Sequence, residues 1–119
     1  MNTLTEREQM KFILNGRTFD TSTSQTVAIS RGIFESPTEG GYFPEFGISW
    51  QSVRYEDVLY RTAKGALFIH DHRTAKYQHG KPVVSDLAKE MSPEEAARWI
   101  EENGAIIVDP TGLSLPDEA

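Results

Sequence analysis

The sequence predicts an α+β domain, with a small antiparallel sheet of about four or five strands and one C-terminal helix packed on one face. Three observations predict this class. Residues 11–20 and 57–72 each have the pattern of a β-hairpin, and residues 92–104 carry the start and stop signals of a helix. The chain has 119 residues and no internal repeat, so we expect a single domain over residues 1–119.

The first hairpin is predicted by a turn dipeptide. The apolar run KFIL is followed by Asn15 and Gly16, which together most readily adopt the positive φ angles of a type I′ turn. A Ser/Thr-rich loop comes next. The β-branched side chains of residues 26–30 then predict a short strand.

Residues 31–50 predict a long loop that carries aromatic side chains. Glycines and prolines recur through this stretch and exclude a long helix, while the aromatic residues argue against a solvated linker. Loops of this length in compact domains are often functional. We therefore hypothesise that Phe43, Phe46 and Trp50 contact a partner. The alternative is that these rings cover an open end of the core.

The second hairpin is the clearest β signal in the chain. Two β-rich runs in residues 57–72 flank a short turn at residues 63–65 that contains a glycine. In a regular second strand, His70 and His72 share one face and Asp71 lies on the other. The polar end of this strand predicts that it runs out into solvent at His70.

Signals at both ends predict a helix over residues 93–103. Ser92 suits the N-cap, Pro93 suits the first helical position, and Glu95 completes a capping box. Gly104 supplies the stop signal. The apolar stripe that packs on the sheet consists of Ala96, Trp99 and Ile100.

The segments beside the helix complete the expected sheet. Gly80 and Pro82 mark a loop, after which residues 83–87 predict a short strand or turn. Residues 105–108 predict a last strand that pairs beside the hairpins.

Composition excludes several classes of protein. The chain has no cysteine, which excludes disulfide scaffolds, thiolate zinc sites and cysteine nucleophiles. The N-terminal segment is acidic where a signal peptide is basic, and no apolar run approaches the roughly 20 residues of a membrane span. We therefore expect a cytoplasmic protein with no membrane partner. We expect flexible ends at residues 1–9 and 110–119.

The charge distribution points to a partner of opposite sign. The net charge is −6, and residues 86–119 hold nine acidic side chains against Lys89 and Arg98. This charge has the wrong sign for direct binding of nucleic acid. Carboxylates along a rigid helix can instead occupy a basic groove of a protein. The residues in this prediction are Glu94, Glu95, Glu101 and Glu102, and the alternative is an ordinary solvated helix face.

Two histidines are the candidate metal ligands. His70 and His72 project from one face of their strand, and such a pair can chelate a metal ion. Further ligands would have to come from Asp57, Asp71 or His79. The alternative is a pair of surface histidines at a strand end, and we expect no metal.

No motif of an enzyme is found. The chain has no G-x-S-x-G elbow and no glycine loop with the spacing of a phosphate cradle. The paired carboxylates of the helix face water, where nothing raises the pKa of one of them. We therefore expect a protein that is not an enzyme and that binds no cofactor.

Two motifs resemble those of a group of short proteins encoded by bacterial plasmids and phages. The first is YRTAKG at residues 60–65 with Phe68 and His70, and the second is SPEEA at residues 92–96 followed by WIE and NG. The resemblance covers roughly two thirds of the chain, and its motifs are structural. Small acidic proteins of mobile genetic elements include anti-CRISPR inhibitors and anti-restriction proteins. The resemblance thus implies an inhibitor of a bacterial defence complex.

These observations lead to one function and two alternatives. We expect a non-catalytic protein of a mobile genetic element that inhibits a bacterial defence complex, such as a CRISPR effector, through protein–protein contacts. The first alternative is a small metal-binding module or metal-dependent enzyme that uses His70 and His72. The second is a structural accessory protein that assembles with itself.

Overall fold

The structure is a computed structural model that describes residues 9–35, 42–43, 48–49, 52–76, 81–113 and 115. Its strands are β1 (Lys11–Leu14), β2 (Arg17–Asp20), β3 (Gln25–Glu35), β4 (Tyr42–Phe43), β5 (Ile48–Ser49), β6 (Ser52–Arg61), β7 (Leu67–Lys76), β8 (Val83–Met91) and β9 (Ile106–Ile107). Its helices are the short 3-10 helix η2 (Thr21–Thr23) and α1 (Pro93–Asn103).

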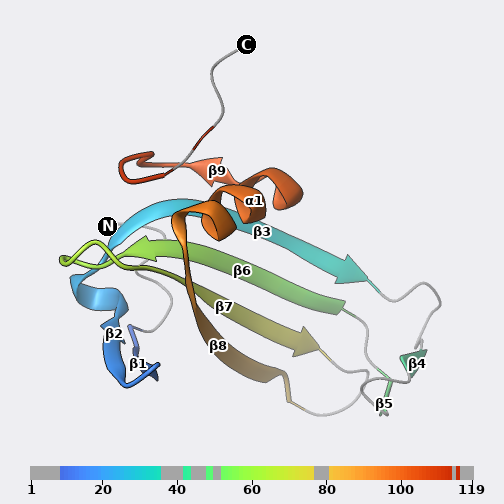
Figure 1. The fold of residues 1–119 in the computed structure, drawn as a ribbon. Coiled ribbons are helices and arrows are strands. Elements are labelled where there is room, and N and C mark those ends of the chain that lie inside the picture. Colours follow the sequence, from blue (N-terminus) through green and yellow to red (C-terminus); the bar gives the residue numbers. More distant parts are fainter. Residues whose placement is uncertain are drawn as a thin grey trace.

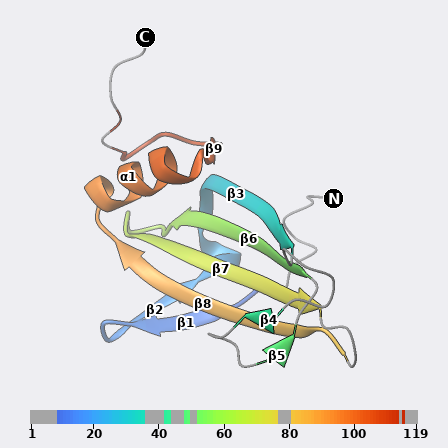
Figure 2. The same ribbon diagram turned by 90° about the vertical axis from the view of Figure 1, so that its right-hand side faces the viewer.

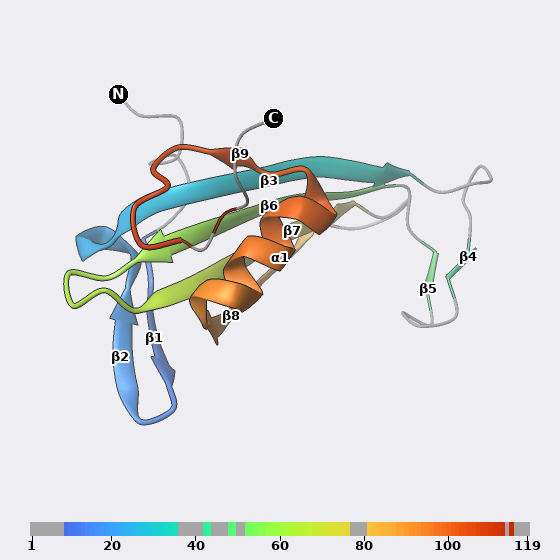
Figure 3. The ribbon, with the colours of Figure 1, turned by 45° about the horizontal axis from the view of Figure 1, so that its top comes forward.

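The main element is a five-stranded antiparallel sheet in the order β8-β7-β6-β3-β9. Helix α1 crosses one face of this sheet, and the hairpin of β1 and β2 lies against the other face (Figure 1). β4 and β5 form a separate two-stranded ladder beyond the far ends of the long strands (Figure 3). The predicted α+β class, with one C-terminal helix on a small antiparallel sheet, is confirmed.

Both predicted hairpins are confirmed. In the turn between β1 and β2, Asn15 has a φ of 52° and Gly16 a φ of 76°, the left-handed angles that a type I′ turn requires. The turn between β6 and β7 is closed by the N–H of Thr62, which donates to the carbonyl of Ala66 over 2.8 Å. This bond encloses a loop of three residues, 63–65, as predicted.

The prediction of a loop over residues 31–50 is wrong in its first part. β3 continues to Glu35 and pairs with β6 along its whole length, apart from a bulge near Val27. Gly32 lies inside this strand, opposite Tyr55. A Cβ atom at Gly32 would lie 2.6 Å from the hydroxyl oxygen of Tyr55, so only glycine leaves room for the ring.

The predicted end of the second hairpin is also wrong. β7 does not run out into solvent at His70 but continues to Lys76. It continues because residues 83–87, predicted as a short strand or turn, belong to β8 and pair with residues 71–75 of β7. β8 also extends to Met91, and its added residues pair with residues 67–70. This pairing satisfies the backbone groups of β7 that solvent would otherwise have to satisfy.

Helix α1 begins and ends where predicted. The Ser92 side chain accepts from the N–H of Glu95 over 3.1 Å, and the Glu95 carboxylate accepts from the N–H of Ser92 over 2.9 Å. Gly104, with a φ of 58°, ends the helix in the left-handed conformation. Both ends of the helix are therefore held by their own caps.

The core consists of two clusters on opposite faces of the sheet, because successive side chains of a strand alternate between faces. The cluster under the helix contains Val27, Ala28, Leu59, Leu67, Ala96 and Ile100. The cluster under the hairpin contains Phe19, Val58, Tyr60 and Phe68. Figure 2 shows the sheet between helix α1 and the hairpin of β1 and β2. Trp99, predicted as part of the apolar stripe of the helix, is only partly buried.

Arg61 ties the segment after β9 to the end of the sheet. Its guanidinium donates to the Asp109 carboxylate over 2.6 Å and to the side-chain oxygen of Gln25 over 3.0 Å. It also donates to the carbonyl of Thr111. Hydrogen bonds from the side chain and backbone of Thr111, and then from Arg61, lower the pKa of Asp109 from 3.8 to about 2.

We expect Phe68→Ala to lower the free energy of unfolding by about 3–5 kcal/mol. Phe68 is 0% exposed and contacts the rings of Phe19 and Tyr60, each at a centroid distance of 5.2 Å. The matched control is Phe34→Ala, because Phe34 is 50% exposed and stacks on the ring of Tyr55. Urea unfolding should give a loss of about 1 kcal/mol for the control. Equal losses would contradict the two-cluster core.

Asp109 should make part of the free energy of unfolding depend on pH in the acid range. Its pKa is lower in the folded chain than in the unfolded chain, so its contribution is complete above about pH 4 and is lost as the pH falls toward about 2. In Asp109→Asn, urea unfolding should therefore show a smaller loss of stability between neutral pH and about pH 3 than in the wild type. An unchanged acid dependence would show that the hydrogen bonds from Thr111 and Arg61 do not lower the pKa of this carboxyl.

Candidate functional site

The four predicted helix carboxylates lie on α1, which is fixed across the sheet by its apolar side. All four residues are exposed. Glu95 differs from the other three, because its carboxylate accepts the Ser92 N–H and this hydrogen bond lowers its pKa. Glu95 therefore serves the helix cap. The side chains of Glu94, Glu101 and Glu102 make no hydrogen bond or ion pair with any residue that the structure describes.

The predicted aromatic surface is described only in part. Phe43 belongs to β4 and its backbone pairs with Ile48 of β5. Phe46 and Trp50 lie outside the described residues, as does His79. The contact role of the three aromatic residues stays a prediction.

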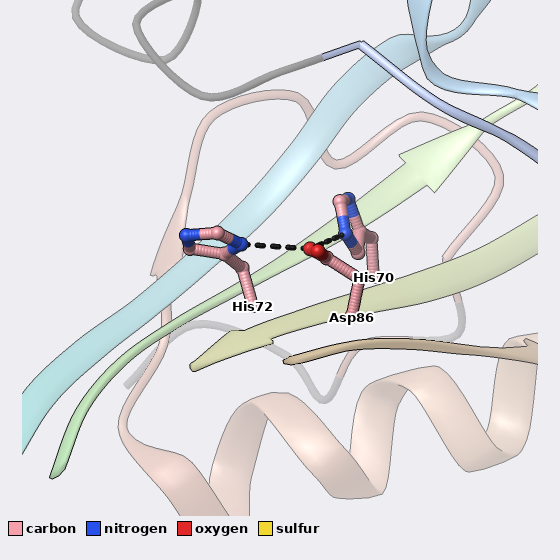
Figure 4. Close-up of side chains that lie close together, drawn as sticks. All are labelled: His70, His72 and Asp86. Carbon is pink, nitrogen blue, oxygen red and sulfur yellow. Dashed lines mark hydrogen bonds and ion pairs between the residues drawn. The ribbon is translucent and has the colours of Figure 1, made fainter. Parts of the chain in front are cut away.

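The two histidines of β7 meet an acidic residue of β8. Figure 4 shows His70 and His72 on the same face of the sheet, with Asp86 between them. The Asp86 Oδ1 lies 2.8 Å from Nε2 of His70 and 2.7 Å from Nδ1 of His72. The three donor atoms all lie within 4.8 Å of one another. One carboxylate oxygen thus bridges two imidazole rings.

The strand register explains why these side chains meet. His72 and Asp86 are directly opposite each other in the antiparallel ladder of β7 and β8, so their side chains point to the same face. His70 is two residues before His72 and therefore shares that face. The side chain of His70 also contacts the ring of Phe12 edge to face at 4.9 Å. The hairpin covers His70 in this way.

Burial differs across the group. The side chain of His70 is 1% exposed, that of Asp86 15% and that of His72 28%. The interpretation of both histidines as surface residues at a strand end is therefore wrong for His70, because the hairpin and the extended β8 cover it. Burial raises the pKa of Asp86, but hydrogen bonds and charge from His72 and His70 lower it more, so the net shift is downward.

The carboxylates first considered as ligands lie elsewhere. Asp71 points away from the histidines, as predicted, and accepts from Nε of Arg73 over 3.0 Å. Asp57 is buried on that same opposite face, across the ladder from Asp71. The sequence analysis did not predict Asp86 as a ligand, because it lies on the neighbouring strand β8, 14 residues from His72 in the chain. The only local signal for its position was the strand pattern of residues 83–88, in which Asp86 shares one face with Val84 and Ala88.

Exposed aliphatic side chains gather on the two edge strands. β8 presents Val83, Val84 and Leu87, and the other edge presents Ile106, Ile107 and Val108. Edge strands with exposed apolar side chains are common sites of contact between proteins. Ile106, Ile107 and Val108 follow shortly after the C-terminal end of α1. Exposed aliphatic side chains are therefore close in the sequence to the acidic side chains of the helix.

Comparison of the chain with protein-family models, with curated proteins and with solved structures finds no match. Among the residues that the structure describes, no helix has the length and apolar character needed to cross a membrane.

We expect Asp86→Ala to lower the free energy of unfolding by about 1–3 kcal/mol, because it removes the acceptor shared by two imidazole rings, one of them buried. The matched control is Asp71→Ala, one residue from each histidine but on the other face. The side chain of its partner Arg73 is 42% exposed, so the control should cost about 1 kcal/mol or less. A larger loss for Asp71→Ala in urea unfolding would contradict this assignment.

Proposed function

We propose that this protein is a non-catalytic binding protein whose acidic helix face docks on a basic surface of another protein. The observation that carries the proposal is the position of Glu94, Glu101 and Glu102. They lie on the solvent side of a helix that is capped at both ends and packed on the sheet. Their positions are therefore rigid, and little side-chain ordering beyond the carboxylates themselves is needed on binding.

Three acidic residues outside the helix are paired within the fold, which supports the helix face as the docking surface. Glu90 interacts with Arg17 and Asn15, and Asp109 interacts with Arg61. Asp86 interacts with the two histidines. The negative charge of these residues is thus partly neutralised within the fold, whereas the outer face of α1 keeps its charge, opposed within the helix only by Arg98.

The partner chemistry follows from this charge. A protein groove that normally holds nucleic acid is lined by Lys and Arg, and carboxylates presented along a helix complement it. The exposed Ile106 and Val108 add apolar area beside the charged face. The resemblance to proteins of mobile genetic elements selects the partner to test first, a CRISPR effector or another nucleic-acid-binding defence complex.

The first experiment asks whether the protein and nucleic acid compete for one groove. Tagged protein is incubated with a purified CRISPR effector complex, and target DNA is then added in increasing amounts. The proposal expects the effector to be retained on the tagged protein and displaced by DNA, because both ligands need the same basic residues. Retention that DNA does not affect would show that the contact lies outside the nucleic-acid groove.

The second experiment tests the helix face itself. We expect the triple variant Glu94→Gln, Glu101→Gln and Glu102→Gln to slow association with the effector about tenfold or more at low salt, with a smaller difference at high salt. Association rates are measured by biolayer interferometry. Thermal unfolding should change little, because exposed charges contribute little to stability.

The matched control changes net charge equally at a distance from α1. Thr18→Lys, Ala63→Lys and Ser85→Lys together add three positive charges at exposed positions, which raises the net charge as much as removing the three helix carboxylates does. If the control slows association as much as the helix variant does, net charge rather than the helix face decides binding. If only Phe43→Ala, Phe46→Ala and Trp50→Ala abolish binding, the aromatic surface is the contact and the helix proposal is wrong.

A further inference from the structure

We propose that His70, His72 and Asp86 form a binding site for one divalent transition-metal ion of the zinc type. The inference rests on the chemistry of the three donors and on their convergence within 4.8 Å. It goes beyond the proposed docking function, because this group lies on the opposite face of the sheet from α1.

The distances suit a metal after a small movement. Zinc binds imidazole nitrogen and carboxylate oxygen at about 2.0–2.2 Å, which places neighbouring ligand atoms of a tetrahedral site about 3.3–3.5 Å apart. Oδ1 of Asp86 now lies 2.7 and 2.8 Å from the two ring nitrogens, the separation of hydrogen bonds. The two ring nitrogens lie within 4.8 Å of each other, so the rings must also turn toward one another to reach this separation. That turn, a shift of the carboxylate and loss of the ring protons convert the arrangement into three metal bonds.

The surrounding structure holds the three ligands in place. His70 and His72 come from one face of β7, and Asp86 stands opposite His72 on β8. The ring of Phe12 packs against His70 and limits its rotation. Strand-mounted ligands of this kind need little reorganisation to bind. The partly exposed His72 leaves a path by which an ion can reach the buried His70.

The donor set selects the class of metal. Two imidazole nitrogens and one carboxylate oxygen suit zinc, iron, cobalt or nickel, whereas calcium and magnesium prefer oxygen ligands alone. Three protein ligands leave a coordination position for water or for a group of another molecule. A bound ion would also join the edge strand β8 to β7, so binding should stabilise the folded chain.

The test is a titration of the full chain after treatment with a chelator. Zinc is titrated by calorimetry, and cobalt by its ligand-field absorption, which reports the number and type of ligands. We expect one ion per chain and a higher melting temperature with zinc. Neither measurement involves a protein partner, so the result is independent of whether the docking proposal holds.

The variants keep the fold while changing single ligands. Asp86→Asn retains an acceptor oxygen but loses its charge, and His72→Ala changes a partly exposed ring. Changing a group that only orients a metal ligand typically weakens metal binding ~10–100-fold. Each variant changes a ligand itself, so each should weaken zinc binding by at least that factor. The matched control Asp71→Asn removes the same charge one residue from each histidine, on the other face, and should bind zinc like the wild type.

Two results would overturn the proposal. One is a wild-type chain that shows no cobalt spectrum and no zinc heat, which would make the group a hydrogen-bonded cluster only. The other is zinc binding that survives in both Asp86→Asn and His72→Ala, which would place the ion elsewhere. Far-UV circular dichroism checks each variant, and if Asp86→Asn does not fold, His72→Ala decides the question because its side chain is 28% exposed.

Discussion

The structure depends on burying the end of β6 and the start of β7, next to the turn that joins them, on both faces of the sheet. Val58, Leu59 and Tyr60 are consecutive and all buried, although consecutive side chains of a strand point in opposite directions. Helix α1 covers Leu59, and the hairpin of β1 and β2 covers its two neighbours. Neither cover alone would remove this apolar run from water, so the helix and the hairpin are both required by the central strands.

The same constraint creates the histidine–aspartate group. The hairpin covers its face of the sheet as far as His70, which contacts Phe12, and His72 lies just past that contact. The group therefore lies where the covered part of the sheet meets the solvated part. A fully buried group would be closed to ligands, and a fully exposed one would hold its side chains less firmly. Asp71, on the other face, interacts with Arg73 instead.

The two proposed sites are separated by the sheet. Helix α1, which carries the carboxylates, lies on one face (Figure 3), and His70, His72 and Asp86 project from the other (Figure 4). This separation makes the two proposals physically independent, because a change in one group of side chains leaves the packing around the other intact.

The sequence by itself determined the elements whose signals are local. These are the type I′ hairpin at Asn15 and Gly16, the hairpin closed at residues 63–65, and the helix with its Ser92 cap, because neighbouring residues decide turn and cap conformations. Only the tertiary structure decided that β8 pairs along all of β7, which buries His70 and brings Asp86 to it. Such pairing depends on contacts between distant residues, and Gly32, a loop signal in the sequence, is a strand residue because β3 pairs with β6, and a glycine stands there because the Tyr55 ring occupies the space of a Cβ atom.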